Sequence, residues 1–369
     1  MSAAPSRVAE ASTADPAPSR PAGLDALHGA LEAAGFAPRP ERAPDPTPDP
    51  AAPRRARRAA VEVRREPDID YAATAALAEE GFGAAPGTFT AEGLRWLYER
   101  AFTDGTTVLA AHADGRKVGH IALVHQTVTM PAGPERAVAL MDLFIIKAFR
   151  SKAAMAALYG AVERFCRDEG IRFIVAVPNG NAAGVNVRYL SLVEAARLEI
   201  RVGFGGFGGL GRRVDSRSVA ELDPADGRAL LDRFCGTEPG SLLWTGARMW
   251  DRLSKPGAGY ALHATDDLLL VSAPRRDRRA AHTLLCALLP RPGATPARRD
   301  VGAVVSAACR LHRRPLFVYA GINGGVPLPG MLLPGRLRPS PMILQLRDFT
   351  EGAPPFAPSR FEAIDFDFA

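Results

Sequence analysis

The chain has few of the features that mark a membrane, secreted or metal-binding protein. Over its 369 residues no apolar run approaches the roughly 18 residues that a transmembrane helix needs. The opening Met1–Pro5 segment lacks the basic stretch and apolar core of a secretory signal. The four cysteines are scattered and form no Cys-x-x-Cys pair, which argues against disulfide and zinc frameworks. We therefore expect a cytoplasmic protein with no metal and no membrane span.

Lysine is scarce as well, occurring only at positions 117, 147, 152 and 255, whereas arginine, alanine, proline and glycine are abundant. The net charge of +6 would suit an anionic ligand. However, no basic motif with interleaved aromatic residues is present, which argues against nucleic acid as a partner. The basic balance is better explained by the codon usage of a GC-rich genome.

Residues 1–66 have too few apolar side chains to build a core. The segment is rich in Ala, Pro and Arg, with prolines recurring through residues 38–50. Because it cannot bury enough surface to offset its chain entropy, we predict a disordered arm. Leu24, Leu27 and Leu31 interrupt it at helical spacing. A transient helix and a docking peptide for a protein partner are both open interpretations of these leucines.

The most informative segment begins with an apolar run at residues 139–146, followed by a basic turn that contains Arg150 and Lys152. A helical pattern comes next, and a second apolar run at 173–177 stops at Pro178-Asn179. The unpaired N–H groups and the dipole of a helix start favour an anion above such a turn. The pattern thus predicts a strand–turn–helix–strand unit that holds an anion, unless the two basic side chains are simply solvated.

This unit resembles the acyl-CoA-binding core of the GCN5-related N-acetyltransferase (GNAT) superfamily. Its acidic-Leu-x-Val, aromatic-Arg-Gly-x-Gly-x-Gly and Pro-Asn motifs correspond to Asp142-Leu143-Phe144-Ile145, Phe149–Met155 and Val177-Pro178-Asn179. The chain departs from the family at three positions where the family prefers glycine. Glycine lets the backbone approach a pyrophosphate closely. The residues that replace glycine are Ser151, Ala153 and Met155.

The resemblance implies an α/β (α+β) fold, with a GNAT-like mixed sheet flanked by helices in residues 67–214. A helix around Trp96 and a hairpin at Asp114-Gly115 fit the start of such a domain. Residues 215–369 look like the second half of tandem GNAT proteins but lack an Arg-Gly-x-Gly-like turn. We expect this second GNAT-like lobe to shape the acceptor cleft without binding a cofactor.

The resemblance also implies acetyl-CoA or another acyl-CoA as the donor and a small amine, such as an amino sugar, as the acceptor. The pantetheine would lie along Leu143, Phe144 and Ile145, and the turn would cradle the pyrophosphate. The further donor-binding residues are Arg150, Ser151, Lys152, Ala153, Ala154 and Asn179. For Asn179 the alternative role is to cap the following helix.

Asp142 is the first candidate for the base that deprotonates the amine, since burial in an apolar strand would favour proton uptake. The alternative is a structural carboxylate paired with an arginine. His120 and His125, on the preceding strand, are further candidate bases. The resemblance further implies that a tyrosine in the helix after Pro178-Asn179 is the acid for the leaving thiolate; Tyr189 is the candidate, with core packing as its alternative role.

Two functions follow from these observations. The first is an acyl-CoA-dependent N-acyltransferase in which the amine attacks the thioester directly. The second is a catalytically silent GNAT-like binding or scaffold protein, favoured by the loss of the three glycines from the phosphate turn.

Overall fold

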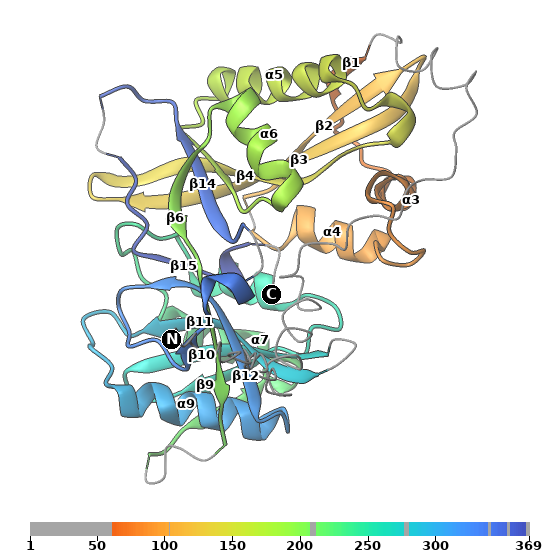
Figure 1. Cartoon of the computed structure of the whole chain (residues 1–369). Coiled ribbons are helices and arrows are strands. Elements are labelled where there is room, and N and C mark those ends of the chain that lie inside the picture. The colour runs from red at the N-terminus through yellow and green to blue at the C-terminus, as the bar shows by residue number, and fades with distance from the viewer. Residues whose placement is uncertain are drawn as a thin grey trace, which may run out of the picture.

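The computed structural model describes residues 61–102, 104–206, 212–276, 280–338, 341–352 and 355–366. Within these ranges the strands form two mixed sheets, stacked one above the other in Figure 1. Helices flank both sheets. This arrangement confirms the predicted mixed α/β class and its two-lobed organisation. Residues 1–60, with the Leu24-Leu27-Leu31 cluster of the expected arm, lie outside the described residues.

The first sheet has the strand order β1-β2-β3-β4-β5-β14-β6. Asp114 and Gly115 join β2 to β3, and both have positive φ (50° and 75°), as the predicted two-residue hairpin turn requires. The strands of this sheet are β1 Glu62–Arg65, β2 Thr106–Ala113, β3 Arg116–Met130, β4 Gly133–Ile145, β5 Phe173–Ala176, β6 Val193–Arg197 and β14 Ile343–Asp348.

Four helices cover the two faces of the first sheet, α3 and α4 on one and α5 and α6 on the other (Figure 1). Alternation along β3 serves both faces: Ala122 joins the core that contains Leu94 of α4, and neighbouring Ile121 joins the core that contains Leu158 of α5. The helices are α3 Tyr71–Phe82, α4 Ala91–Glu99, α5 Lys152–Asp168 and α6 Gly180–Leu190, with a short 3₁₀ helix, Lys147–Phe149, before α5. Thr90 caps α4 by accepting the Gly93 N–H at 3.0 Å.

The second sheet has the order β13-β7-β12-β11-β10-β9-β8, with β15 paired to β12. Its strands are β7 Glu199–Phe204, β8 Asp215–Ser218, β9 Ala261–Ala264, β10 Leu268–Arg276, β11 Ala281–Pro290, β12 Leu316–Asn323, β13 Met331–Leu332 and β15 Arg360–Glu362. The associated helices are α7 Pro224–Asp232, α8 Gly246–Leu253 and α9 Arg298–Leu311, with 3₁₀ turns at Val219–Glu221, Gly335–Leu337 and Ala363–Asp365.

The same unit occurs once in each sheet. In the first, β4 and β5 are parallel and α5 connects them; in the second, β11 and β12 are parallel and α9 connects them. A parallel pair needs such a crossover because the chain must return to the same end of the sheet. The two lobes thus repeat the strand–helix–strand unit that the sequence predicts at residues 139–177.

The two sheets also exchange strands. β14, near the C-terminal end, inserts between β5 and β6 of the first sheet, with Leu346 opposite Val175. In turn β7, which follows β6 directly, pairs with β12 of the second sheet, with Val202 opposite Val318. The lobes that we expected at 67–214 and 215–369 are therefore not independent blocks of sequence.

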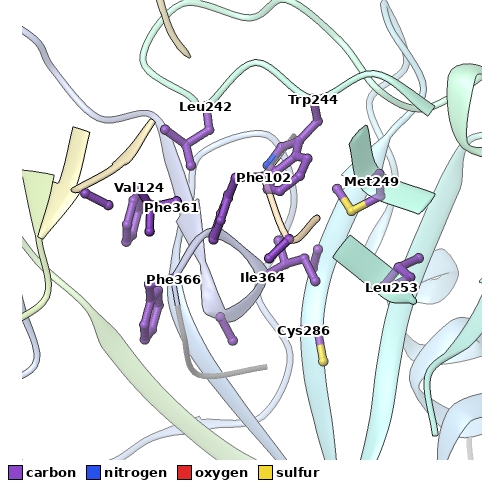
Figure 2. Packing of buried hydrophobic residues seen from close by; sticks show 14 of the residues in the cluster. Phe102, Val124, Leu242, Trp244, Met249, Leu253, Cys286, Phe361, Ile364 and Phe366 are labelled. Atoms are coloured by element: carbon purple, nitrogen blue, oxygen red, sulfur yellow. The ribbon is translucent and has the colours of Figure 1, made fainter. Parts of the chain in front are cut away.

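A shared hydrophobic core joins the lobes (Figure 2). Phe102 and Val124 come from the first lobe, and Trp244, Met249 and Cys286 come from the second. Phe361, Ile364 and Phe366, which belong to the segment that begins with β15, pack in the same core. This C-terminal segment packs against both lobes at once.

The fully buried Arg252 of α8 strengthens the same junction. Its guanidinium carbon lies 4.9 Å from the ring centroid of Trp96 and 5.1 Å from that of Phe102, within cation–π range. It also donates hydrogen bonds to the carbonyls of Ile364 (3.0 Å) and Phe366 (2.7 Å).

Among the described residues no helix is both long and apolar enough to cross a membrane.

Candidate active site

A β-bulge in β4 places Asp142. The pairing of β3 with β4 shifts between His120, which opposes Phe144, and Ala122, which opposes Met141. Asp142 and Leu143 therefore face a single residue of β3. Asp142 has a left-handed backbone with φ 48°, which aspartate tolerates better than most residues. Bulges of this kind redirect a side chain, and they are frequent beside active sites.

The Asp142 side chain meets a tyrosine from α4. The Tyr98 hydroxyl donates to Asp142 Oδ2 at 2.8 Å and lies 2.9 Å from His120 Nε2. The His120 ring stacks between Tyr98 and Phe144, with centroids 5.8 and 5.2 Å away. Two of the predicted catalytic residues, Asp142 and His120, are thus brought together by a third side chain.

The three side chains differ in exposure. His120 is fully buried, Tyr98 is 3% exposed and Asp142 is half-buried. Burial, assisted by the charge of Lys117, holds the pKa of His120 well below its usual value. His120 is therefore neutral at physiological pH and lies behind Tyr98, while Asp142 is the member of the group nearest to solvent.

Beside the bulge, β4 and β5 part from each other. Their parallel ladder ends where Ala139 opposes Val175, but β4 continues to Ile145 without a partner strand on that side among the described residues. The Ile146 N–H donates to Val118 of β3 at 2.9 Å, so the Ile145 N–H points to the opposite edge, toward β5. We call this place the β4–β5 fork; it contains the predicted Leu143, Phe144 and Ile145.

The start of α5 borders the turn that follows the fork. Ser151 caps the helix, its Oγ accepting the Ala154 N–H at 3.0 Å. The Lys152 and Ala153 N–H groups belong to the first turn, where an α-helix provides no internal acceptor. Lys152 and Ala153 are both exposed, whereas Ala154 is buried. The turn presents two backbone donors and one lysine.

The Arg150 side chain is used within the protein. Its Nε donates to the Ile145 carbonyl at 2.7 Å, and an Nη donates to the carbonyl of Gly81 at the end of α3. From the sequence, we expected this guanidinium to bind the pyrophosphate. In the structure it ties the end of β4 to α3, although Arg150 as a whole remains exposed, as does Lys152 at the helix start.

The other predicted residues lie apart from the Asp142 group. Asn179 caps α6 by accepting the N–H groups of Asn181 and Ala182, both at 3.0 Å, its alternative role. Tyr189 packs on Tyr159 of α5, ring centroids 5.5 Å apart, in the core on the opposite face of the sheet from Tyr98. The assignment of Tyr189 as acid remains a prediction.

His125 also lies away from Asp142. Its Nε2 is 3.0 Å from Thr107 Oγ1, and its ring contacts Phe165 of α5. Because His125 and His120 are an odd number of residues apart on β3, their side chains point to opposite faces.

In the described part of the chain no group of three or more His, Cys, Asp or Glu residues is placed to hold a metal ion.

Tyr98 is the site residue that sequence reasoning missed. Its partner Asp142 is 44 positions away, and no local pattern connects the two. The available signal was a tyrosine on a short helix in which Leu94, Trp96 and Leu97 are also buried. A helix so largely apolar must pack on several sides, so its one hydroxyl needs a polar partner.

In the second lobe the corresponding fork lies between β11 and β12, and it is occupied by another strand. Beyond the β11–β12 ladder, β15 pairs with β12, with Glu362 opposite Gly321. Both carboxyl oxygens of Glu362 lie 3.2 Å from the Leu288 N–H of β11, and Asn323 Nδ2 donates to the Leu288 carbonyl at 2.8 Å. The chain itself therefore fills this fork, and the N–H and carbonyl of Leu288 are already bonded.

Comparison with known proteins agrees with this geometry. The model of the acetyltransferase (GNAT) family matches residues 74–187, which span α3 to α6. No curated protein sequence matches the chain.

Solved structures share the fold at low identity. A probable N-acyltransferase from Enterococcus faecalis aligns with a TM-score of 0.58 at 9% identity, over 78% of this chain and 73% of that one. A GCN5-related N-acetyltransferase from Kribbella flavida gives 0.54 at 15% identity, over 78% and 71%. Eis1 from Mycobacterium abscessus gives 0.50 at 14% identity, over 82% of each chain. Residues 74–187 of this chain therefore form a domain of the acetyltransferase (GNAT) family.

Proposed function

We propose that the chain is an acyl-CoA-dependent N-acyltransferase that moves an acyl group, such as acetyl, from a CoA thioester to a small amine. The observation that carries this proposal is the position of Asp142. Its carboxylate lies at the bulge where β4 leaves β5, on the strand whose end leads into α5. A base, an unpaired strand edge and a helix start are thus neighbours along one strand and its connection.

The donor would lie in the β4–β5 fork. The Ile145 N–H, which points to the β5 side, would bond to the pantetheine arm as a strand partner would. The Lys152 and Ala153 N–H groups, with the Lys152 ammonium, would receive the pyrophosphate at the positive end of the α5 dipole. This placement brings the thioester carbonyl to the bulge and therefore to Asp142.

The reaction needs two protons to leave the attacking nitrogen. Asp142 takes the first from the acceptor ammonium, which frees the lone pair for attack on the thioester carbon. The new C–N bond forms and the C–S bond breaks, so that CoA departs as a thiolate. The second proton passes from the nitrogen to that sulfur. Tyr189 is our predicted carrier for it, and amide and CoA thiol are the products.

We further propose that the second lobe binds no donor and instead supports the acceptor side of the site. Support comes from the fork between β11 and β12, which is closed by β15 and by the Glu362 carboxyl on the Leu288 N–H. A pantetheine arm would have to displace a paired strand there. One donor site per chain follows from this difference between the lobes.

The silent binding or scaffold protein is the second candidate, and one observation favours it. Ser151 Oγ already occupies the Ala154 N–H, so the turn offers fewer backbone donors than a glycine-rich turn would. Ser151 and Ala153 also carry side-chain atoms where the family has glycine.

Acyl transfer by the purified chain distinguishes the two functions. Acetyl-CoA and longer acyl-CoA donors are incubated with a panel of primary amines that includes amino sugars, and CoA thiol release is compared with the mass of the acceptors. We expect thiol release that depends on the amine, together with an acceptor heavier by one acyl group. A folded chain that acylates no amine from any donor would establish the silent alternative.

A further inference from the structure

We propose that Tyr98 is a positioning residue that holds the Asp142 carboxylate for proton transfer, as the middle member of a hydrogen-bonded chain from His120 to Asp142. This inference rests on the proposed acyl transfer. These hydrogen bonds join three elements, with Tyr98 on α4, His120 on β3 and Asp142 at the bulge of β4. The three positions are far apart in sequence, and the fold brings their side chains together.

Which group donates in each of these hydrogen bonds follows from a count of protons. The Tyr98 hydroxyl carries one proton and lies within 3 Å of two atoms that could accept it, Asp142 Oδ2 at 2.8 Å and, if it is unprotonated, His120 Nε2 at 2.9 Å. An ionised carboxylate has no proton to give, so Tyr98 donates to Asp142. The bond to His120 then requires the imidazole to donate, which places the His120 proton on Nε2.

The surroundings of His120 agree with this tautomer. Its Nδ1 is buried and has no hydrogen-bond partner among the described residues. A bare ring nitrogen suits such a place better than an unpaired N–H, because buried donors without acceptors are rarer in proteins. Lys117 is the charged group that acts on the ring, and it is engaged by Glu66 at 2.5 Å.

This chain gives Tyr98 and His120 different roles from that of Asp142. Both are buried, so neither reaches an acceptor amine. By donating to the carboxylate, Tyr98 fixes its orientation and favours its ionised form. His120 in turn keeps the Tyr98 hydroxyl pointed at Asp142. The Nε2–H of His120 donates to the Tyr98 oxygen, so the hydroxyl proton cannot point toward the imidazole.

Tyr98→Phe tests this role, with Tyr71→Phe as the matched control. Tyr71 packs 6.2 Å from Tyr98 in the same aromatic group, but its hydroxyl donates to Glu99. We expect Tyr98→Phe to lower kcat about 10-fold or more while the KM for the acyl donor changes little. The acidic limb of its kcat/KM profile should move to higher pH, because the carboxylate has lost a donor. Tyr71→Phe should change neither.

His120 supplies a conservative comparison. Gln at position 120 keeps an N–H near the place of Nε2, and Leu removes it. We therefore expect His120→Gln to retain most of the activity and His120→Leu to show the Tyr98→Phe profile. Equal loss in both variants, or none in either, would contradict the hydrogen-bonded chain.

A measurement without turnover tests the chain directly. Nitrogen-15 NMR of the labelled protein at pH 7.5 should show His120 as the neutral Nε2–H tautomer, and Tyr98→Phe should abolish this preference. An Nδ1–H tautomer in the unaltered protein would overturn the proposal. If the unaltered protein transfers no acyl group, the proposed function fails; if it does and Tyr98→Phe leaves kcat and pH profile unchanged, only this inference fails.

Discussion

At the scale of single residues, the account depends on Asp142. Asp142→Asn keeps the shape, tolerates the left-handed backbone and can still accept from Tyr98, but it cannot take up a proton. We expect turnover to fall by about 10²–10⁴, the usual contribution of a general base. Affinity for CoA should stay within a few fold. Steady-state rates and donor titration on the same preparation measure both quantities.

Asp114→Asn is the matched control for that change. Asp114 also has a left-handed backbone, with φ 50°, but lies in the exposed β2–β3 turn. It should leave rate and melting temperature unaltered. A folded, fully active Asp142→Asn protein would remove Asp142 from the mechanism. A loss of activity accompanied by a fall in melting temperature of many degrees would instead indicate the structural carboxylate that the sequence left as an alternative.

At the scale of secondary-structure elements, local patterns predicted local structure well. The strand at 139–146, the helix after the basic turn and the hairpin at Asp114-Gly115 all depend on neighbours in sequence, and all are present. The Asp142 bulge and the Tyr98 contact were not predictable, because each depends on a residue elsewhere in the chain. For Arg150 the charge was visible in the sequence, but its two carbonyl partners were not.

The strand β15 offers a pH test of the closed fork in the second lobe. Burial raises the pKa of Glu362 to about 8, so the folded state prefers the protonated acid. In the unfolded chain the carboxyl group has its ordinary pKa of 4.5. This contribution to stability is therefore fully present below pH 4.5 and is lost as pH rises through about 8.

Glu362→Gln should remove this dependence, since the amide resembles the neutral acid. Relative to the unaltered protein, the variant should gain free energy of unfolding by about 1.4 kcal/mol per pH unit across that window. Chemical denaturation at pH 5, 6.5 and 8 measures the difference. Glu199→Gln on β7 is the control, because its carboxylate is half-exposed and bound to Arg201. Parallel curves for Glu362→Gln and the unaltered protein would refute the argument.

At the scale of the whole molecule, the strand exchange predicts that the two lobes unfold together. Removing β14 from the first sheet or β7 from the second would separate paired strands, and both lobes share the core around Phe361 and Ile364. Differential scanning calorimetry of the full chain should therefore show one transition, with equal calorimetric and van't Hoff enthalpies. Two resolved transitions would show that the lobes are independent.

The central claim is that the first lobe has an open donor site and the second has a closed one. Isothermal titration of the full chain with acetyl-CoA tests it most directly. Lys152→Glu reverses the exposed charge at the start of α5, and Arg164→Glu makes the same change about 18 Å further along that helix. We predict one acetyl-CoA per chain, affinity lost in Lys152→Glu and retained in Arg164→Glu. No binding by the unaltered chain, or two molecules bound per chain, would contradict the account.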